Sequence, residues 1–206
     1  MNKETENRQP LYEYLLSAFD VVEKFSLEHP EALCPVKVEK ALIPFICKRL
    51  GISILRRAKS YPQKQLFGAL LRYHDRAEIL YSVDLNLCWR RYVVVKELGH
   101  LLLDASNHYT TNPIDLVEGL INQLPFSDMT SAVDVDRAMT IFAVELLLPH
   151  SCSADIMQMH HNGAPAHVIA TKYRVPSKLV DMYLSTSYQA IHNEVLLLRP
   201  PYSSGR

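Results

Sequence analysis

Residues 91–103, RYVVVKELGHLLL, have the spacing of a helical metal-binding motif in which one ligand is exchanged. In the pattern H-E-x-x-H, two histidines four residues apart on one helical face bind Zn²⁺, and the glutamate activates a water molecule. Glu97 and His100 stand at the second and fifth positions of this pattern, but Lys96 stands at the first. The segment therefore indicates metal-dependent hydrolysis with the first metal ligand missing.

A second block strengthens this interpretation, because E-x-x-H alone occurs in many helices as an ordinary solvated or structural face. Residues 142–149 read FAVELLLP, and Arg91 and Tyr92 precede the first motif at a fixed distance. With Phe67-Gly68 and the run 51–54 before them, the blocks resemble the ImmA/IrrE family of metallopeptidase-fold regulators over about residues 51–185. In that family a helix R-[FY]-x-x-x-H-E-L-G-H-L-L-L is followed by a variable insert and by a helix that ends F-A-x-E-L-L-x-P.

The resemblance implies zinc as cofactor and a third metal ligand on the second helix, six residues before Phe142. This position is usually Glu in the family and is Asp136 here, which is shorter by one methylene group. Asp134 takes the position if the register is shifted, and an acid at a helix N-terminus that the helix dipole stabilises is the structural alternative. A catalytic zinc site has three protein ligands and a water molecule, so His100 and Asp136 leave the site one ligand short.

Lys96 can have two roles in a site that lacks one metal ligand. As a zinc ligand, Lys96 must first lose its proton, which costs roughly 4.6 kcal/mol at pH 7. As a protonated side chain, Lys96 replaces the metal as a fixed cation that pairs with Asp136, Glu97 or both. The second role fits the substitutions better. Two other histidines, His108 and His150, are expected at the surface.

The order of apolar runs predicts an α+β fold with a zincin-like core at residues 10–150 and disordered residues 1–9. Helical spacing favours N-terminal helices at 10–29 and 35–50, the second interrupted by Pro44. Short β-compatible runs predict a small antiparallel sheet with a hairpin at residues 74–76; these runs are residues 52–55, 66–71 and 79–83.

Two long helices are expected to form the cleft, one from Asp84 as N-cap to residue 103 and one at residues 132–148. Between them lies a polar insert, residues 106–131, with a short helix at 114–123. Residues 151–192 are predicted to form a helical unit of helix–turn–helix spacing, with helices at 153–161, 164–173 and 177–185. Residues 193–206 are predicted to be a flexible tail.

Composition bounds the partners and the compartment. The formal net charge is zero, so no global field favours nucleic acid or anionic membrane. Lys172, Arg174 and Lys178 form a basic cluster too small to favour direct DNA binding, so packing or partner binding is preferred. No apolar run approaches the roughly 20 residues that span a bilayer, and no signal peptide is recognisable, so a cytoplasmic protein is expected. The four cysteines are widely spaced and are interpreted as buried thiols rather than as a disulfide or a metal site.

Two functions are consistent with these residues. The resemblance implies a regulatory protein with a degenerate KELGH site, non-catalytic or weakly metal-binding, that binds a helix–turn–helix transcriptional regulator. The alternative is an active metal-dependent endopeptidase that cleaves a helix–turn–helix repressor, with Glu97 polarising water and His100 and Asp136 holding the metal. The non-catalytic function is favoured because the loss of a primary ligand is hard to compensate.

Overall fold

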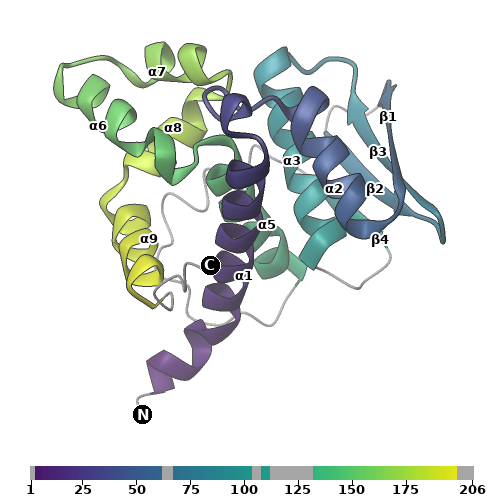
Figure 1. The fold of residues 1–206 in the computed structure, drawn as a ribbon, viewed down its shortest axis with the longest axis horizontal. Helices are drawn as coiled ribbons and strands as arrows, with labels where there is room; N and C mark the ends of the chain where they lie inside the picture. Colours follow the sequence, from purple (N-terminus) through teal and green to yellow (C-terminus); the bar gives the residue numbers. More distant parts are fainter. Residues whose placement is uncertain (1–2, 62–66, 104–107, 112–131, 199–206) are drawn as a thin grey trace.

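A computed structural model describes the backbone of residues 3–61, 67–103, 108–111 and 132–198, and the side chains of 16–61, 67–102 and 138–197. The fold is α+β, as predicted. The sheet and α2 lie on one side, α1 and α5 in the middle, and α6 to α9 on the other side (Figure 1). The elements in chain order are α1 (Lys3–Glu28), η1 (Pro30–Ala32), η2 (Val38–Leu42), α2 (Ile43–Leu50), β1 (Ser53–Lys59), β2 (Gly68–Arg72), β3 (Arg76–Ser82), α3 (Leu87–Leu103), β4 (His108–Thr111), α5 (Ala132–Leu147), η3 (His150–Cys152), α6 (Ser153–His161), α7 (Ala166–Tyr173), α8 (Ser177–Leu184) and α9 (Thr186–Leu198).

The N-terminal helices differ from the prediction at their starts. Helix α1 begins at Lys3 and takes in most of the segment expected to be disordered, residues 1–9. Lys, Glu, Arg and Gln in that segment are good helix formers, which explains the extension. The interruption at Pro44 is confirmed, because a π-helical turn ends at Leu42 and α2 then starts with Pro44 in its first turn. A proline is tolerated there since its missing N–H has no intrahelical partner.

The sheet is mixed, whereas an antiparallel sheet was predicted. Its order is β1-β3-β2-β4. The predicted hairpin is confirmed, with β2 antiparallel to β3 from Gly68 opposite Tyr81 to Arg72 opposite Ala77. Because β3 inserts between β1 and β2, it pairs with β1 in parallel, and β4 adds to the other edge of β2. Strand order and direction depend on such long-range insertion, which the local sequence pattern does not encode.

Helix α3 begins later than predicted, and its N-cap is Asn86 rather than Asp84. The Asn86 Oδ1 accepts a hydrogen bond from the backbone N–H of Trp89 at 3.0 Å. The Asp84 backbone N–H instead donates to Ser82 Oγ at 3.2 Å, in a turn that precedes the helix. Helix α5 was predicted correctly within one residue. The identification of this core as zincin-like stays a prediction.

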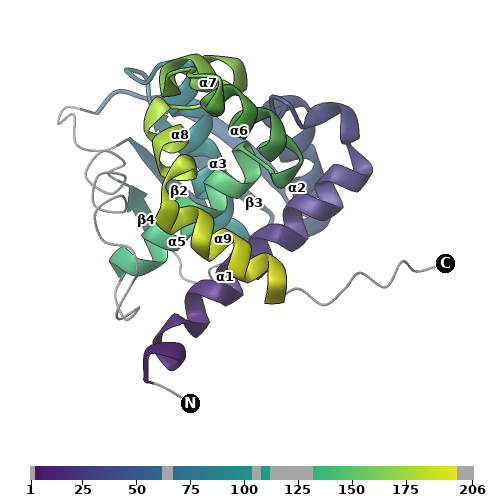
Figure 2. The same ribbon diagram turned by 90° about the vertical axis from the view of Figure 1, so that its left-hand side faces the viewer.

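The C-terminal helices α6, α7 and α8 confirm the three predicted there, but α9 was not predicted as a helix. It runs to Leu198, so residues 193–198 belong to a helix and not to the predicted tail. Val195 and His192 on this helix are buried, and Figure 2 shows α9 lying against α1. Residues 199–206 and the predicted helix at 114–123 lie outside the described residues. No helix in the described ranges has the length and apolar character that a membrane span requires.

The prediction that all four cysteines are thiols is wrong for one pair. Cys34 and Cys152 form a disulfide with their Cα atoms 6.6 Å apart, across a sequence separation of 118 residues. Cys47 and Cys88 are free thiols, as predicted, but both are partly exposed rather than buried. The fold brings the loop after η1 beside η3, a proximity that cysteine spacing cannot reveal. The disulfide therefore ties the N-terminal part of the chain to the start of the C-terminal helices.

Candidate functional site

The KELGH segment, residues 96–100, lies in the interior of the protein. Lys96, Glu97 and His100 on α3 each have 0% of their surface exposed. Lys96 and His100 follow Tyr92 at intervals of four residues, so these three residues share one face of the helix. Buried charged side chains are rare in proteins unless other groups compensate their charge.

Helix α5 packs closely against this part of α3. The hydroxyl groups of Tyr92 and Thr140 lie 3.0 Å apart across the two helices. A Cβ atom at Gly99 would lie only 2.8 Å from Cδ1 of Phe142, so the glycine of KELGH permits the close approach of the helices. Asp136 lies in α5 four residues before Thr140, about one helical turn away. The side chain of Asp136 is outside the described residues, and its role as a ligand stays a prediction.

The sheet covers Glu97 from another side. A Cβ atom at Gly68 of β2 would lie 3.2 Å from Oε1 of Glu97, so this carboxylate faces the backbone of the strand. The Arg72 guanidinium on the same strand donates a hydrogen bond to the backbone carbonyl of His100. Burial and the nearby Glu97 carboxylate both raise the pKa of Tyr61. Tyr61 and Arg72 were not predicted as site residues, and neither belongs to a recognisable motif.

These residues do not fit a catalytic zinc ion. Such a site needs three protein ligands and an open fourth position. Among the described residues, no group of three or more His, Cys, Asp or Glu side chains is placed to hold a metal ion. Lys96 stands where the motif has a neutral imidazole nitrogen, and a lysine ammonium has no lone pair to offer a metal. The described residues of the motif therefore lack the ligand set on which hydrolysis at a zinc ion depends.

A second buried polar cluster lies further along α5, at the glutamate of the FAVELLLP block. Glu145 Oε1 accepts hydrogen bonds from the Tyr188 hydroxyl and from His192 Nδ1, the second at 2.7 Å. His192 Nε2 lies 3.5 Å from Nδ1 of His150, which is exposed as predicted. Tyr188 and His192 come from α9 and were not predicted. The signal for them was indirect, since a glutamate within an apolar helix requires buried hydrogen-bond donors.

The Tyr188 hydroxyl makes the stability of the fold vary with pH in the alkaline range. Burial, reinforced by the Glu145 carboxylate, raises the pKa of Tyr188 well above its ordinary value. Its neutral form therefore stabilises the fold fully below about pH 10, and this stabilisation is lost as the pH rises further. We expect Tyr188→Phe to reduce the decline of the unfolding free energy by up to about 1.4 kcal/mol per pH unit above pH 10.

Denaturant unfolding between about pH 9 and pH 11.5 measures this slope. The slope is the readout because Tyr188→Phe also removes a hydrogen bond to Glu145, which lowers stability at every pH. Tyr73→Phe is the matched control, since Tyr73 is 44% exposed. If Tyr188→Phe left the dependence of the unfolding free energy on pH unchanged, the raised pKa of Tyr188 would be contradicted.

Comparisons with known proteins leave the family unassigned. No protein-family profile and no curated protein matches the chain. A solved structure of a Mycobacterium tuberculosis transcriptional regulator aligns with 87% of this chain and 52% of its own, at 14% identity and a TM-score of 0.48. This chain thus spans about half the length of that regulator. A likeness this distant carries no functional argument, and the relation to the ImmA/IrrE family stays a resemblance.

Proposed function

We propose that this protein is a non-catalytic regulatory protein in which Lys96 takes the place of a metal ion beside a metallopeptidase-like motif. The observation that carries the proposal is the complete burial of Lys96, Glu97 and His100 on α3. A hydrolytic site must admit water and a peptide to its glutamate, and Glu97 has no exposed surface. A buried cation instead suits a structural role, because it compensates the charge of neighbouring carboxylates.

The proposed partner is a helix–turn–helix transcriptional regulator. The sequence resemblance alone supports this partner class. Direct DNA binding is not part of the proposal, because the basic cluster is small and the ammonium group of one of its three residues is already paired with a carboxylate. Lys172 donates hydrogen bonds to both carboxylate oxygens of Asp155 at 2.7 Å.

The metal content of native protein and of the Lys96→His variant tests the proposal. The variant restores two histidines four residues apart on one face of α3, with Asp136 as the proposed third ligand. We expect far less than one zinc per chain in the native protein and about one in the variant, measured by mass spectrometry after purification without a metal-binding tag.

The control is the Lys96→His/His100→Ala double variant, which keeps the new histidine and removes its neighbour. It is expected to lose the zinc again, which locates the metal at the motif. About one zinc per chain in the native protein would overturn the proposal and would favour the peptidase alternative.

A further inference from the structure

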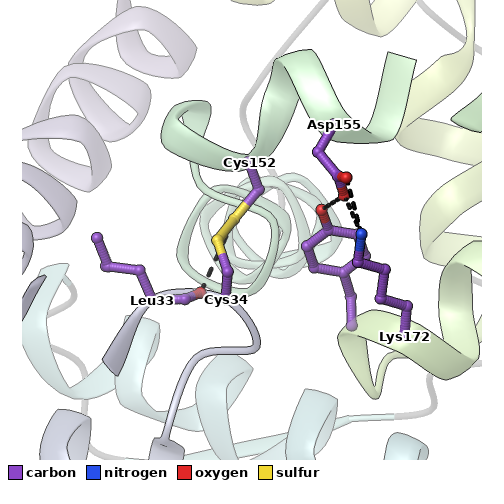
Figure 3. The surroundings of a disulfide bond; sticks show 6 residues. Leu33, Cys34, Cys152, Asp155 and Lys172 are labelled. Carbon is purple, nitrogen blue, oxygen red and sulfur yellow. Dashed lines mark hydrogen bonds and ion pairs between the residues drawn. A yellow bond between two sulfur atoms is a disulfide. The ribbon is translucent and has the colours of Figure 1, made fainter. Parts of the chain in front are cut away.

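The two halves of the disulfide differ in accessibility. Cys34 lies on an exposed loop after η1, whereas Cys152 is 1% exposed. In Figure 3, Cys152 stands at the start of the C-terminal helices, with its Sγ 3.8 Å from the backbone carbonyl of Leu33. A thiolate must reach a disulfide sulfur directly in order to break the bond. Attack from solvent is therefore directed to Cys34.

A pocket of about 510 Å³ opens beside this exposed cysteine, and its lining is rich in cations. Cys34 lines it together with Lys37, Lys40, Arg91 and Arg174. In the part of the chain that the structure describes, Lys37, Lys40 and Arg174 form no ion pair with a carboxylate. Cationic side chains that converge on one cavity raise the local concentration of anions.

The acidic side chains near the pocket do not cancel this charge. Glu31 and Glu39 also line it. Glu39 forms an ion pair with Arg56 at 3.0 Å, which leaves Glu31 alone among the described carboxylates of the lining to oppose the cations. Asp155, near the disulfide in Figure 3, is neutralised by Lys172 at 2.7 Å. The pocket therefore retains an excess of positive charge beside Cys34.

The buried guanidinium of Arg91 holds the walls of the pocket in place. Its Nη2 donates to the backbone carbonyl of Val36 at 2.7 Å, and its Nε donates to that of Arg174 at 3.0 Å. Arg91 is 4% exposed, and Arg174 has a left-handed backbone with φ of 56° in the turn between α7 and α8. Arg91 on α3 thus holds the loop at Val36 and the turn at Arg174 in fixed positions. A buried side chain therefore determines the shape of the pocket, which is more than a chance grouping of surface lysines.

We propose that this pocket is a thiol–disulfide exchange site for a small thiol that carries carboxylate groups. The carboxylates bind among the cations, and the thiolate sulfur attacks Sγ of Cys34. The bond to Cys152 breaks, its electron pair leaves with Cys152 as a thiolate, and that thiolate takes a proton from water. A second thiol then attacks the small-molecule sulfur of the mixed disulfide, which releases Cys34 as a thiolate and forms the symmetrical small-molecule disulfide. Two thiols thereby supply the two electrons that reduce the protein.

Thiols of different charge test the site on the full-length oxidised protein. Mercaptosuccinate carries two carboxylates, 2-mercaptoethanol is neutral, and cysteamine is cationic. Reduction of the Cys34–Cys152 disulfide is followed by acid quenching, alkylation and peptide mass spectrometry, with rates divided by the thiolate fraction of each reagent. At about 0.02 M salt we expect mercaptosuccinate to react roughly 5–10 times faster than 2-mercaptoethanol, and cysteamine to react slowest. At about 0.5 M salt the advantage should largely vanish.

Two further readouts distinguish a specific site from general charge effects. The mixed disulfide is expected on Cys34, and an adduct mainly on Cys152 would overturn the proposal. Lys37→Glu and Lys40→Glu should each lower the ratio of mercaptosuccinate to 2-mercaptoethanol rates about three- to fivefold. Lys59→Glu makes the same charge change outside the pocket lining and should leave the ratio unchanged. Equal rates for the anionic and neutral thiols at low salt, or an equal effect of Lys59→Glu, would also overturn the proposal.

Discussion

Replacing Lys96 by alanine is expected to lower the free energy of unfolding by about 3–5 kcal/mol. Lys96 and Glu97 are both fully buried. Under the proposed role of Lys96, removing the cation leaves a carboxylate in the interior without its compensating charge. For a chain of 206 residues this loss corresponds to a fall in Tm of about 6–20 °C. Denaturant unfolding at pH 7, with thermal unfolding as a second probe, measures both quantities.

Lys96→Met separates the lost charge from the lost volume. Methionine fills a similar space without a charge, so a cost due mainly to charge should be similar for Lys96→Met and Lys96→Ala. The variant Glu97→Gln completes a double-mutant cycle with Lys96→Met. If the two side chains compensate each other, the double variant should be more stable than the sum of the single effects predicts, by about 1–3 kcal/mol. Wild-type stability for Lys96→Met would show that the ammonium group has no structural role.

The elements predicted well from the sequence are those that local pattern determines. The apolar period of α5 and the KELGH motif of α3 identified both helices of the site, and Pro44 marked the break before α2. The motif also placed Lys96 and His100 on one helical face. These features depend on residues within a few turns of each other, so the sequence pattern contains them.

The features that were missed depend on contacts between distant segments. The parallel pairing of β1 depends on the position of β3 between two other strands. The approach of Gly68 to Glu97 depends on how α3 packs on the sheet. Neither of these relations leaves a period or spacing in the chain, and a single sequence therefore does not encode them in a readable form.

Loss of the Cys34–Cys152 disulfide is expected to destabilise the protein by about 4–5 kcal/mol. The bond closes a loop across a sequence separation of 118 residues. A cross-link over so long a loop acts chiefly by restricting the unfolded chain. Cys34→Ser is the preferred variant because Cys34 is exposed, whereas replacing the buried Cys152 would also disturb packing. Denaturant unfolding of both proteins under oxidising conditions gives the difference.

Reductant provides the internal control, because the native protein without its disulfide should unfold at nearly the same denaturant concentration as Cys34→Ser. Cys47→Ser removes a free cysteine but keeps the disulfide, so it should show the same difference between oxidising and reducing conditions as the native protein. Equal stability of the oxidised native protein and Cys34→Ser would contradict the prediction. A change of 4–5 kcal/mol is a large part of the roughly 5–15 kcal/mol by which folded proteins are stable. Thiol exchange at the exposed Cys34 would then control the stability of the whole fold, while the hydrogen bonds of Arg91 still join the loop at Val36 to the turn at Arg174 in the folded state.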